Sequence, residues 1–117
     1  MNSKTDNDII LLKLLSDDTC YSIMSLTSKK EYSTLNLSNE LQIPISTIYR
    51  KLKILENAKF LQVVRTLVDR AGNQEDYYRC IVDKATVKFS KGKITVKIQR
   101  LNYKDDFVLL WKKIAEK

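Results

Sequence analysis

The spacing of apolar residues changes near residue 60, and that change limits the folds the chain can adopt. Before it, apolar side chains recur every three or four residues, as in 45–58, which is the period of an amphipathic helix. After it they alternate, as in 60–68 and 76–82, which is the period of strands. Helices followed by strands within 117 residues indicate an α+β domain, either alone or with a short extension.

The first half of the chain predicts four helices. Segment 8–15 is nearly all apolar, so its helix should be buried on more than one side. Residues 16–18 can cap a second helix, and Ser33 or Thr34 can cap a third that ends near Gln42.

Pro44, the one proline, separates the third helix from the fourth. Proline disfavours helical geometry at the residue before it and is at home in a first helical turn. The fourth helix should therefore begin at Pro44–Ser46 and run to about residue 59. Two short helices joined by a tight turn, the second one basic, have the helix-turn-helix pattern.

Two hairpins should follow. The strands 60–68 and 76–82 flank the polar loop 69–75, which contains a Gly-Asn turn signal. Residues 86–90 and 93–99 alternate strongly and are joined by Lys-Gly. Segment 103–117 then predicts a closing helix with large apolar residues at helical spacing, namely Phe107, Leu110, Trp111 and Ile114.

A helical projection of 45–58 separates an apolar side from a polar side. The residues expected to face the core are Ile45, Ile48, Leu52 and Leu55. Those expected to face outward are Ser46, Arg50 and Lys53, flanked by Thr47 and Tyr49. Arginine can bond guanine O6 and N7 in a major groove, and lysine suits a phosphate. The alternative is an ordinary solvated basic face.

The tip of the first hairpin carries a second group of polar side chains, Arg70, Asn73 and Gln74. Side chains at such a tip can reach a minor groove or a phosphate. Asp69, Glu75 and Asp76 lie close by and weaken the local positive potential. A merely polar turn is therefore the competing interpretation for this loop.

The positive charge lies in the middle of the chain, which favours an anionic partner. Residues 1–43 carry four Lys and six acidic residues, whereas 44–100 carry thirteen Lys or Arg and five acidic residues. The chain has no histidine, only two glycines and no nucleophile motif, so we expect neither an enzyme nor a cofactor. Cys20 and Cys80 should be buried apolar residues, with redox sensing a minor alternative. No apolar run is long enough to span a bilayer, which predicts a cytoplasmic protein without a membrane partner.

Three stretches resemble the ArsR-like winged-helix regulators, namely 13–24 (KLLSDDTCYSIM), 37–41 (LSNEL) and 46–58 (STIYRKLKILENA). The likeness spans roughly residues 8–82, with three departures. Cys20 stands where the family usually has Arg, Lys59 where it has Gly, and Lys51 where His is common. Asn36 and Ser38 occupy positions that hold thiols in metal-sensing members, so we expect no metal.

The resemblance implies a winged helix-turn-helix domain over 1–82 and a dimerisation extension over 83–117, with the first hairpin as the wing. It also implies a homodimer interface between the first and last helices, formed by Ile10, Leu11, Phe107, Leu110, Trp111 and Ile114. The alternative is that both helices cover only their own domain. The predicted function is sequence-specific binding of double-stranded DNA in transcription regulation. The alternatives are a protein- or RNA-interaction module and a non-specific architectural DNA-binding protein.

Overall fold

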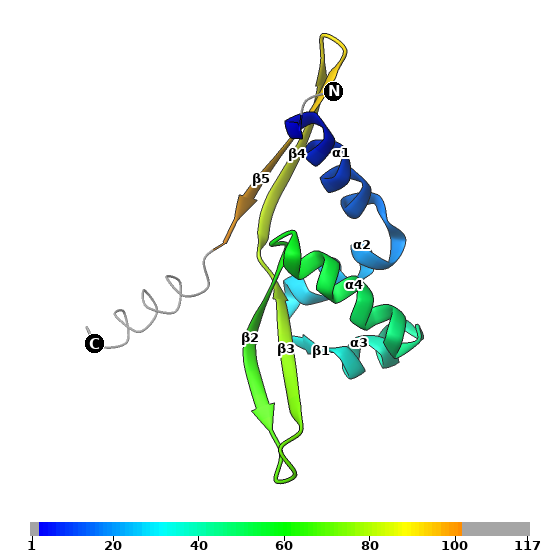
Figure 1. The fold of residues 1–117 in the computed structure, drawn as a ribbon, viewed down its shortest axis with the longest axis vertical. Helices are drawn as coiled ribbons and strands as arrows, with labels where there is room; N and C mark the ends of the chain where they lie inside the picture. Colours follow the sequence, from blue (N-terminus) through cyan, green and yellow to red (C-terminus); the bar gives the residue numbers. More distant parts are fainter. Residues whose placement is uncertain (1–2, 102–117) are drawn as a thin grey trace, which may run out of the picture.

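A computed structural model describes residues 3–101 and shows an α+β fold in which the helices, with one short strand among them, precede two hairpins (Figure 1). The helices within these residues are α1 (Ser3–Ser16), α2 (Asp18–Lys29), α3 (Thr34–Leu41) and α4 (Ile45–Asn57). The strands within them are β1 (Tyr32–Ser33), β2 (Leu61–Val68), β3 (Gln74–Cys80), β4 (Val82–Ser90) and β5 (Lys93–Arg100). The predicted closing helix 103–117 lies outside the described residues.

The helix starts are fixed by the residues that the sequence indicated. The Asp17 side chain accepts a hydrogen bond from the backbone N–H of Cys20 at 2.9 Å and so caps α2. Ser33 Oγ accepts from the backbone N–H of Asn36, and the Asn36 side chain accepts in return from the backbone N–H of Ser33. These side chains satisfy N–H groups that a helix leaves unpaired at its first turn.

The turn between α3 and α4 is held by short-range hydrogen bonds. Gln42 adopts a left-handed backbone conformation (φ 55°) that ends α3, and Ser38 Oγ donates to the carbonyl of Ile43 at 2.6 Å. The carbonyl of Pro44 then accepts from the N–H groups of Thr47 and Ile48, which starts α4. The predicted proline boundary is therefore confirmed.

The strands form two antiparallel sheets, β1-β3-β2 and β4-β5. Strand β1, in which Tyr32 pairs with Tyr78, was not predicted. It has two residues, of which the second, Ser33, is also the cap of α3, so it carries no detectable alternation. Strand β3 begins two residues earlier than expected because the ladder continues to Val68–Gln74, and β4 begins at Val82, four residues early. The two hairpins extend in opposite directions from the helical body (Figure 1).

The core lies where α2, α3 and α4 meet the first sheet. Its fully buried side chains include Ile23, Leu37, Ile48, Leu52, Leu55 and Phe60. Cys20 and Cys80 are buried in it, as expected. Helix α1 packs on β5 and α2. Among the described residues, no helix has both the length and the apolar character needed to cross a membrane.

One core assignment was wrong, because Ile45 is 51% exposed. It lies one turn before Ile48, in the first turn of α4, and its side chain lines a cleft. Periodicity correctly gave its angular position, but the depth of burial depends on how far the neighbouring elements reach along the helix.

Lys59 has a left-handed backbone (φ 61°) at the end of α4, where a glycine would be unstrained. A side chain in this conformation costs about 1–2 kcal/mol compared with glycine. Part of the stability gained by changing to glycine is lost again, because glycine has greater conformational freedom in the unfolded chain. We therefore expect Lys59→Gly to raise the free energy of unfolding in urea by about 0.5–1 kcal/mol. Ala58→Gly is the matched control, because Ala58 is right-handed (φ −76°) and should be destabilised by the same change. A loss of stability in both variants would contradict strain at Lys59.

Candidate nucleic-acid interface

The outer face of α4 is set by the three core residues on its inner face. With Ile48, Leu52 and Leu55 buried, Ser46 and Arg50 are exposed, and Thr47 is half-buried. Tyr49 beside them is 55% exposed. Arg50 forms no ion pair with any described residue, so its guanidinium is available to an external acceptor.

Lys53 is more constrained than the sequence suggested. Its Nζ lies 3.5 Å from Glu56 Oε1 and 5.3 Å from the centre of the Tyr49 ring. The Tyr78 phenol and then the Glu56 carboxylate raise the pKa of the Lys53 ammonium, opposed by desolvation. Lys53 thus stays charged at neutral pH, but Glu56 compensates part of that charge.

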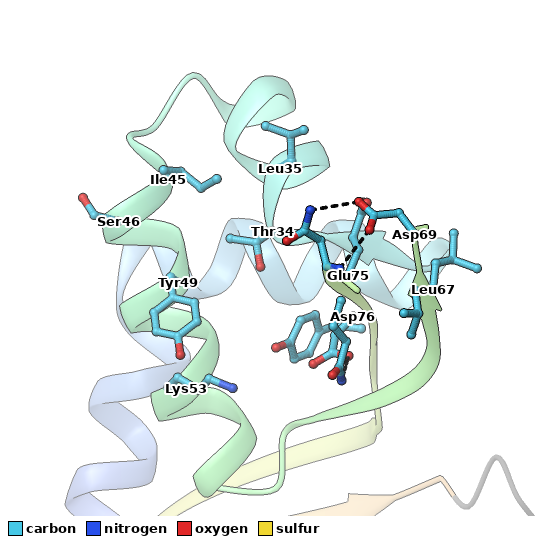
Figure 2. A pocket seen from close by; sticks show the side chains of 14 residues that line it. Thr34, Leu35, Ile45, Ser46, Tyr49, Lys53, Leu67, Asp69, Glu75 and Asp76 are labelled. Carbon is cyan, nitrogen blue, oxygen red and sulfur yellow. Dashed lines mark hydrogen bonds between the residues drawn. The ribbon is translucent and has the colours of Figure 1, made fainter. Parts of the chain in front are cut away.

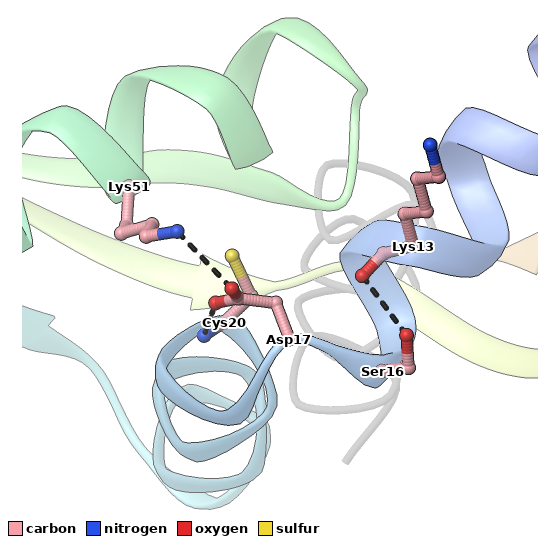
Figure 3. Close-up of polar contacts among 5 residues, drawn as sticks. All are labelled: Lys13, Ser16, Asp17, Cys20 and Lys51. Atoms are coloured by element: carbon pink, nitrogen blue, oxygen red, sulfur yellow. Dashed lines mark hydrogen bonds and ion pairs between the residues drawn. The ribbon is translucent and has the colours of Figure 1, made fainter.

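Lys51 belongs to the body of the fold and not to the outer face. Its Nζ donates to Asp17 Oδ1 at 3.2 Å, and Asp17 Oδ2 accepts from the backbone N–H of Cys20 (Figure 3). This contact joins α4 to the start of α2.

Burial, followed by the neighbouring Asp17, raises the pKa of the Cys20 thiol to about 11, so this thiol is protonated at neutral pH and a poor redox nucleophile.

The tip of the β2–β3 hairpin is organised around Asp69. Its carboxylate accepts from the backbone N–H groups of Ala71 and Asn73 and from the Asn73 side chain at 3.0 Å. The backbone N–H of Asn73, followed by the other bonds, holds the pKa of Asp69 below its usual value. Gln74 donates to Asp76, whereas Arg70 is exposed and has no ion pair with a described residue.

A cleft of about 1020 Å³ lies between α4, the start of α3 and the β2–β3 hairpin (Figure 2). It brings together five of the residues predicted to contact DNA, namely Ser46, Tyr49, Lys53, Asn73 and Gln74. The other three, Thr47, Arg50 and Arg70, do not line it.

Two other groups of residues line this cleft. One is apolar and exposed and comprises Leu35, Ile45, Leu67 and Val68. The other is acidic and comprises Asp69, Glu75 and Asp76. The sequence identified the acidic group at the hairpin tip, but it gave no signal that places Leu35 and the hairpin on one cleft.

The predicted dimer residues are only partly described. Ile10 is exposed, whereas Leu11 is half-buried and packs against the core of its own chain. The remaining four, at positions 107, 110, 111 and 114, lie outside the described residues. Within residues 3–101, no three side chains suited to metal binding come together.

No protein-family model and no curated protein matches this chain in sequence. The similarity to ArsR-like regulators therefore remains a resemblance of motifs and spacing.

The Asp17 cap makes a stability prediction that depends on pH. The backbone N–H of Cys20, and then the Lys51 contacts, lower the pKa of Asp17 despite some desolvation. Its contribution is therefore present above the unfolded value of 3.8 and is lost as pH falls through the lower folded value. Asp17→Ala should cost about 1 kcal/mol at pH 7 and less at pH 3, measured by urea unfolding.

Asp18→Ala is the control, because Asp18 is exposed in the first turn of α2 and does not cap it. Its effect should be smaller than that of Asp17→Ala at pH 7. An equal loss at both pH values for Asp17→Ala would show that the ionised carboxylate contributes nothing to the cap.

Proposed function

We propose that the chain binds double-stranded DNA as a sequence-specific transcription regulator, with α4 in the major groove. The observation that carries this proposal is the exposed, unpaired guanidinium of Arg50 beside Ser46, on a helix anchored through its opposite face. A helix fixed by core packing can hold a base-reading side chain in one register. The order of helix, turn, helix and hairpin is compatible with a winged-helix arrangement.

The β2–β3 hairpin would serve as the wing, with Arg70 as its phosphate or minor-groove contact. Asn73 and Gln74 are weaker candidates for a contact with DNA than the sequence indicates, because both amides already donate to neighbouring carboxylates. The acidic group of the cleft keeps phosphates away from its floor. The DNA backbone would therefore pass outside the cleft, where it could meet Arg50 and Arg70, which do not line it.

We also propose that the active unit is a homodimer. The hairpin β4–β5 has an apolar face on which Val87 and Phe89 are exposed, Phe89 by 72%, and Ile10 is exposed on α1. Together with the apolar residues at the helical spacing predicted for 103–117, they would provide a surface for a second copy. A two-fold dimer would place two α4 helices about 34 Å apart, so the site should be an inverted repeat.

A second candidate function is that of a protein-interaction module. The cleft supports it, since exposed Leu35, Ile45 and Val68 stand next to carboxylates, a combination suited to a basic, apolar peptide. Titration of a random duplex at low and high salt separates the two functions. Duplex binding that weakens steeply with salt supports the DNA-binding role, and no binding at low salt supports the interaction module.

Arg50→Ala tests the base-reading role on a site selected from a random DNA pool. We expect a loss of about 1–3 kcal/mol in binding free energy and relaxed preference at one base pair, measured by fluorescence anisotropy on single-base variants. Lys53→Ala is the control: Lys53 lines the cleft and Glu56 compensates part of its charge, so its loss should have a smaller effect that is the same on all sequences. A uniform loss for Arg50→Ala on every duplex would rule out base reading by this residue.

Phe89→Ser tests the dimer in sedimentation equilibrium. Removing a large anchor from an apolar interface should raise the dimer dissociation constant at least about tenfold. Leu67→Ser is the control, because Leu67 is also exposed but lies on the other hairpin, and it should leave association unchanged. A wild-type chain that stays monomeric at all concentrations would refute the dimer.

A further inference from the structure

The structure separates the basic residues that hold the fold together from those that remain in solvent. Lys51 and Arg65 form ion pairs with carboxylates of the helical half. Arg79 and Arg100 donate to main-chain carbonyls at the end of α2 and just beyond α4. Much of the remaining positive charge lies on one element, the hairpin β4–β5, with Lys84, Lys88, Lys91, Lys93 and Lys97.

Strand register gathers four of these lysines on one side of the hairpin. Lys97 pairs with Thr86, Lys88 with Thr95 and Lys93 with Ser90, while Lys84 pairs with Gln99. Cross-strand partners share a face, and alternate residues along a strand share it too. All eight side chains are exposed. We call this set the lysine face; it consists of Lys84, Thr86, Lys88, Ser90, Lys93, Thr95, Lys97 and Gln99.

The opposite face of the same hairpin is apolar and turns toward the helices. Val96 is buried there, and Ile98 packs against the core, while α1 lies along β5 (Figure 1). The lysine face therefore points away from α1. Within 82–100 the one acidic residue is Asp83, which lies at the bulge that precedes Lys84. No carboxylate of this hairpin interrupts the row of ammonium groups.

We propose that the lysine face is a second surface for the phosphate groups of duplex DNA, separate from the α4 surface. This proposal deepens the proposed function and rests on it. Four ammonium groups with hydroxyls between them are the donors that proteins use for phosphates. Lys84 and Lys88 lie about 14 Å apart along β4, so the face can follow several base pairs of one backbone.

The composition of the face favours a duplex over single-stranded nucleic acids. Single-stranded nucleic acids are held by aromatic side chains on which bases stack, and the one aromatic residue of 82–100, Phe89, lies on the apolar face. Base reading uses arginine and amide side chains, whereas lysine acts as a flexible point charge. The lysine face should therefore add affinity and salt dependence without sequence preference.

The test compares two triple variants of the full chain that lose the same charge. Lys84→Gln, Lys88→Gln and Lys97→Gln alter the lysine face, whereas Lys13→Gln, Lys29→Gln and Lys30→Gln alter exposed lysines of α1 and the end of α2. Binding to a random duplex is followed by fluorescence anisotropy between 50 and 200 mM salt, after circular dichroism melts show that both variants fold. The first variant should lower the log–log salt slope by about 2.7, because each lost phosphate contact contributes about 0.9.

This difference in slope means that the ratio of the wild-type binding constant to that of the variant is about forty-fold larger at 50 mM than at 200 mM salt. The second variant should keep nearly the wild-type slope. Equal changes in the two variants would overturn the proposal, since only net charge would then matter. A lysine-face variant that keeps duplex binding but loses binding to single-stranded RNA, an acidic peptide or anionic vesicles would also overturn it.

Arg50→Ala distinguishes this proposal from the proposed function. It should abolish preference at one base pair and leave the slope change of the lysine-face variant intact. If a specific DNA site is selected but the lysine-face variant keeps the wild-type salt slope, only the lysine-face proposal is refuted. If no specific site is recovered but the lysine-face variant still lowers the salt slope, only sequence-specific regulation is refuted.

Discussion

The packing of α4 through Ile48, Leu52 and Leu55 is the contact on which the other features depend. All three side chains are fully buried, so the helix cannot rotate about its axis without exposing them. That constraint fixes the outward direction of Ser46 and Arg50. It also places the end of α4 so that Phe60 enters the core and β2 begins directly after it. The hairpin that forms the other wall of the cleft is positioned by the same packing.

Positive charge has two roles in this molecule. Arg79 and Arg100 satisfy carbonyls at helix ends, where backbone acceptors lack partners. Lys51 and Arg65 join elements that are far apart in sequence. Such residues raise the net charge without offering it to a ligand. The positive charge that is available to a polyanion is therefore not spread over all the basic residues of the sequence. The β4–β5 hairpin carries a large part of it.

The cleft between α4 and the β2–β3 hairpin combines side chains that can bind a phosphate with carboxylates that repel one. Its α4 wall offers Ser46, Tyr49 and Lys53, while its hairpin wall brings carboxylates close to them. Two of those carboxylates, Asp69 and Asp76, already accept hydrogen bonds inside the hairpin and help to shape its tip. They therefore have a structural role in the hairpin, and their negative charge opposes the entry of phosphate groups into the cleft.

The sequence alone determined the features that depend on neighbours a few residues apart. These include the capping segments 16–18 and 33–34, the boundary at Pro44, both hairpins and the inner face of α4 after its first turn. The resemblance to ArsR-like regulators also singled out position 59, where the family has Gly, and the structure gives Lys59 a left-handed backbone. Only the tertiary structure decided that Ile45 is exposed, that Lys51 is bound to Asp17, that β1 pairs with β3, and that the acidic residues face Lys53. Each of these depends on which distant segments meet, and helical or strand periodicity carries no information about that.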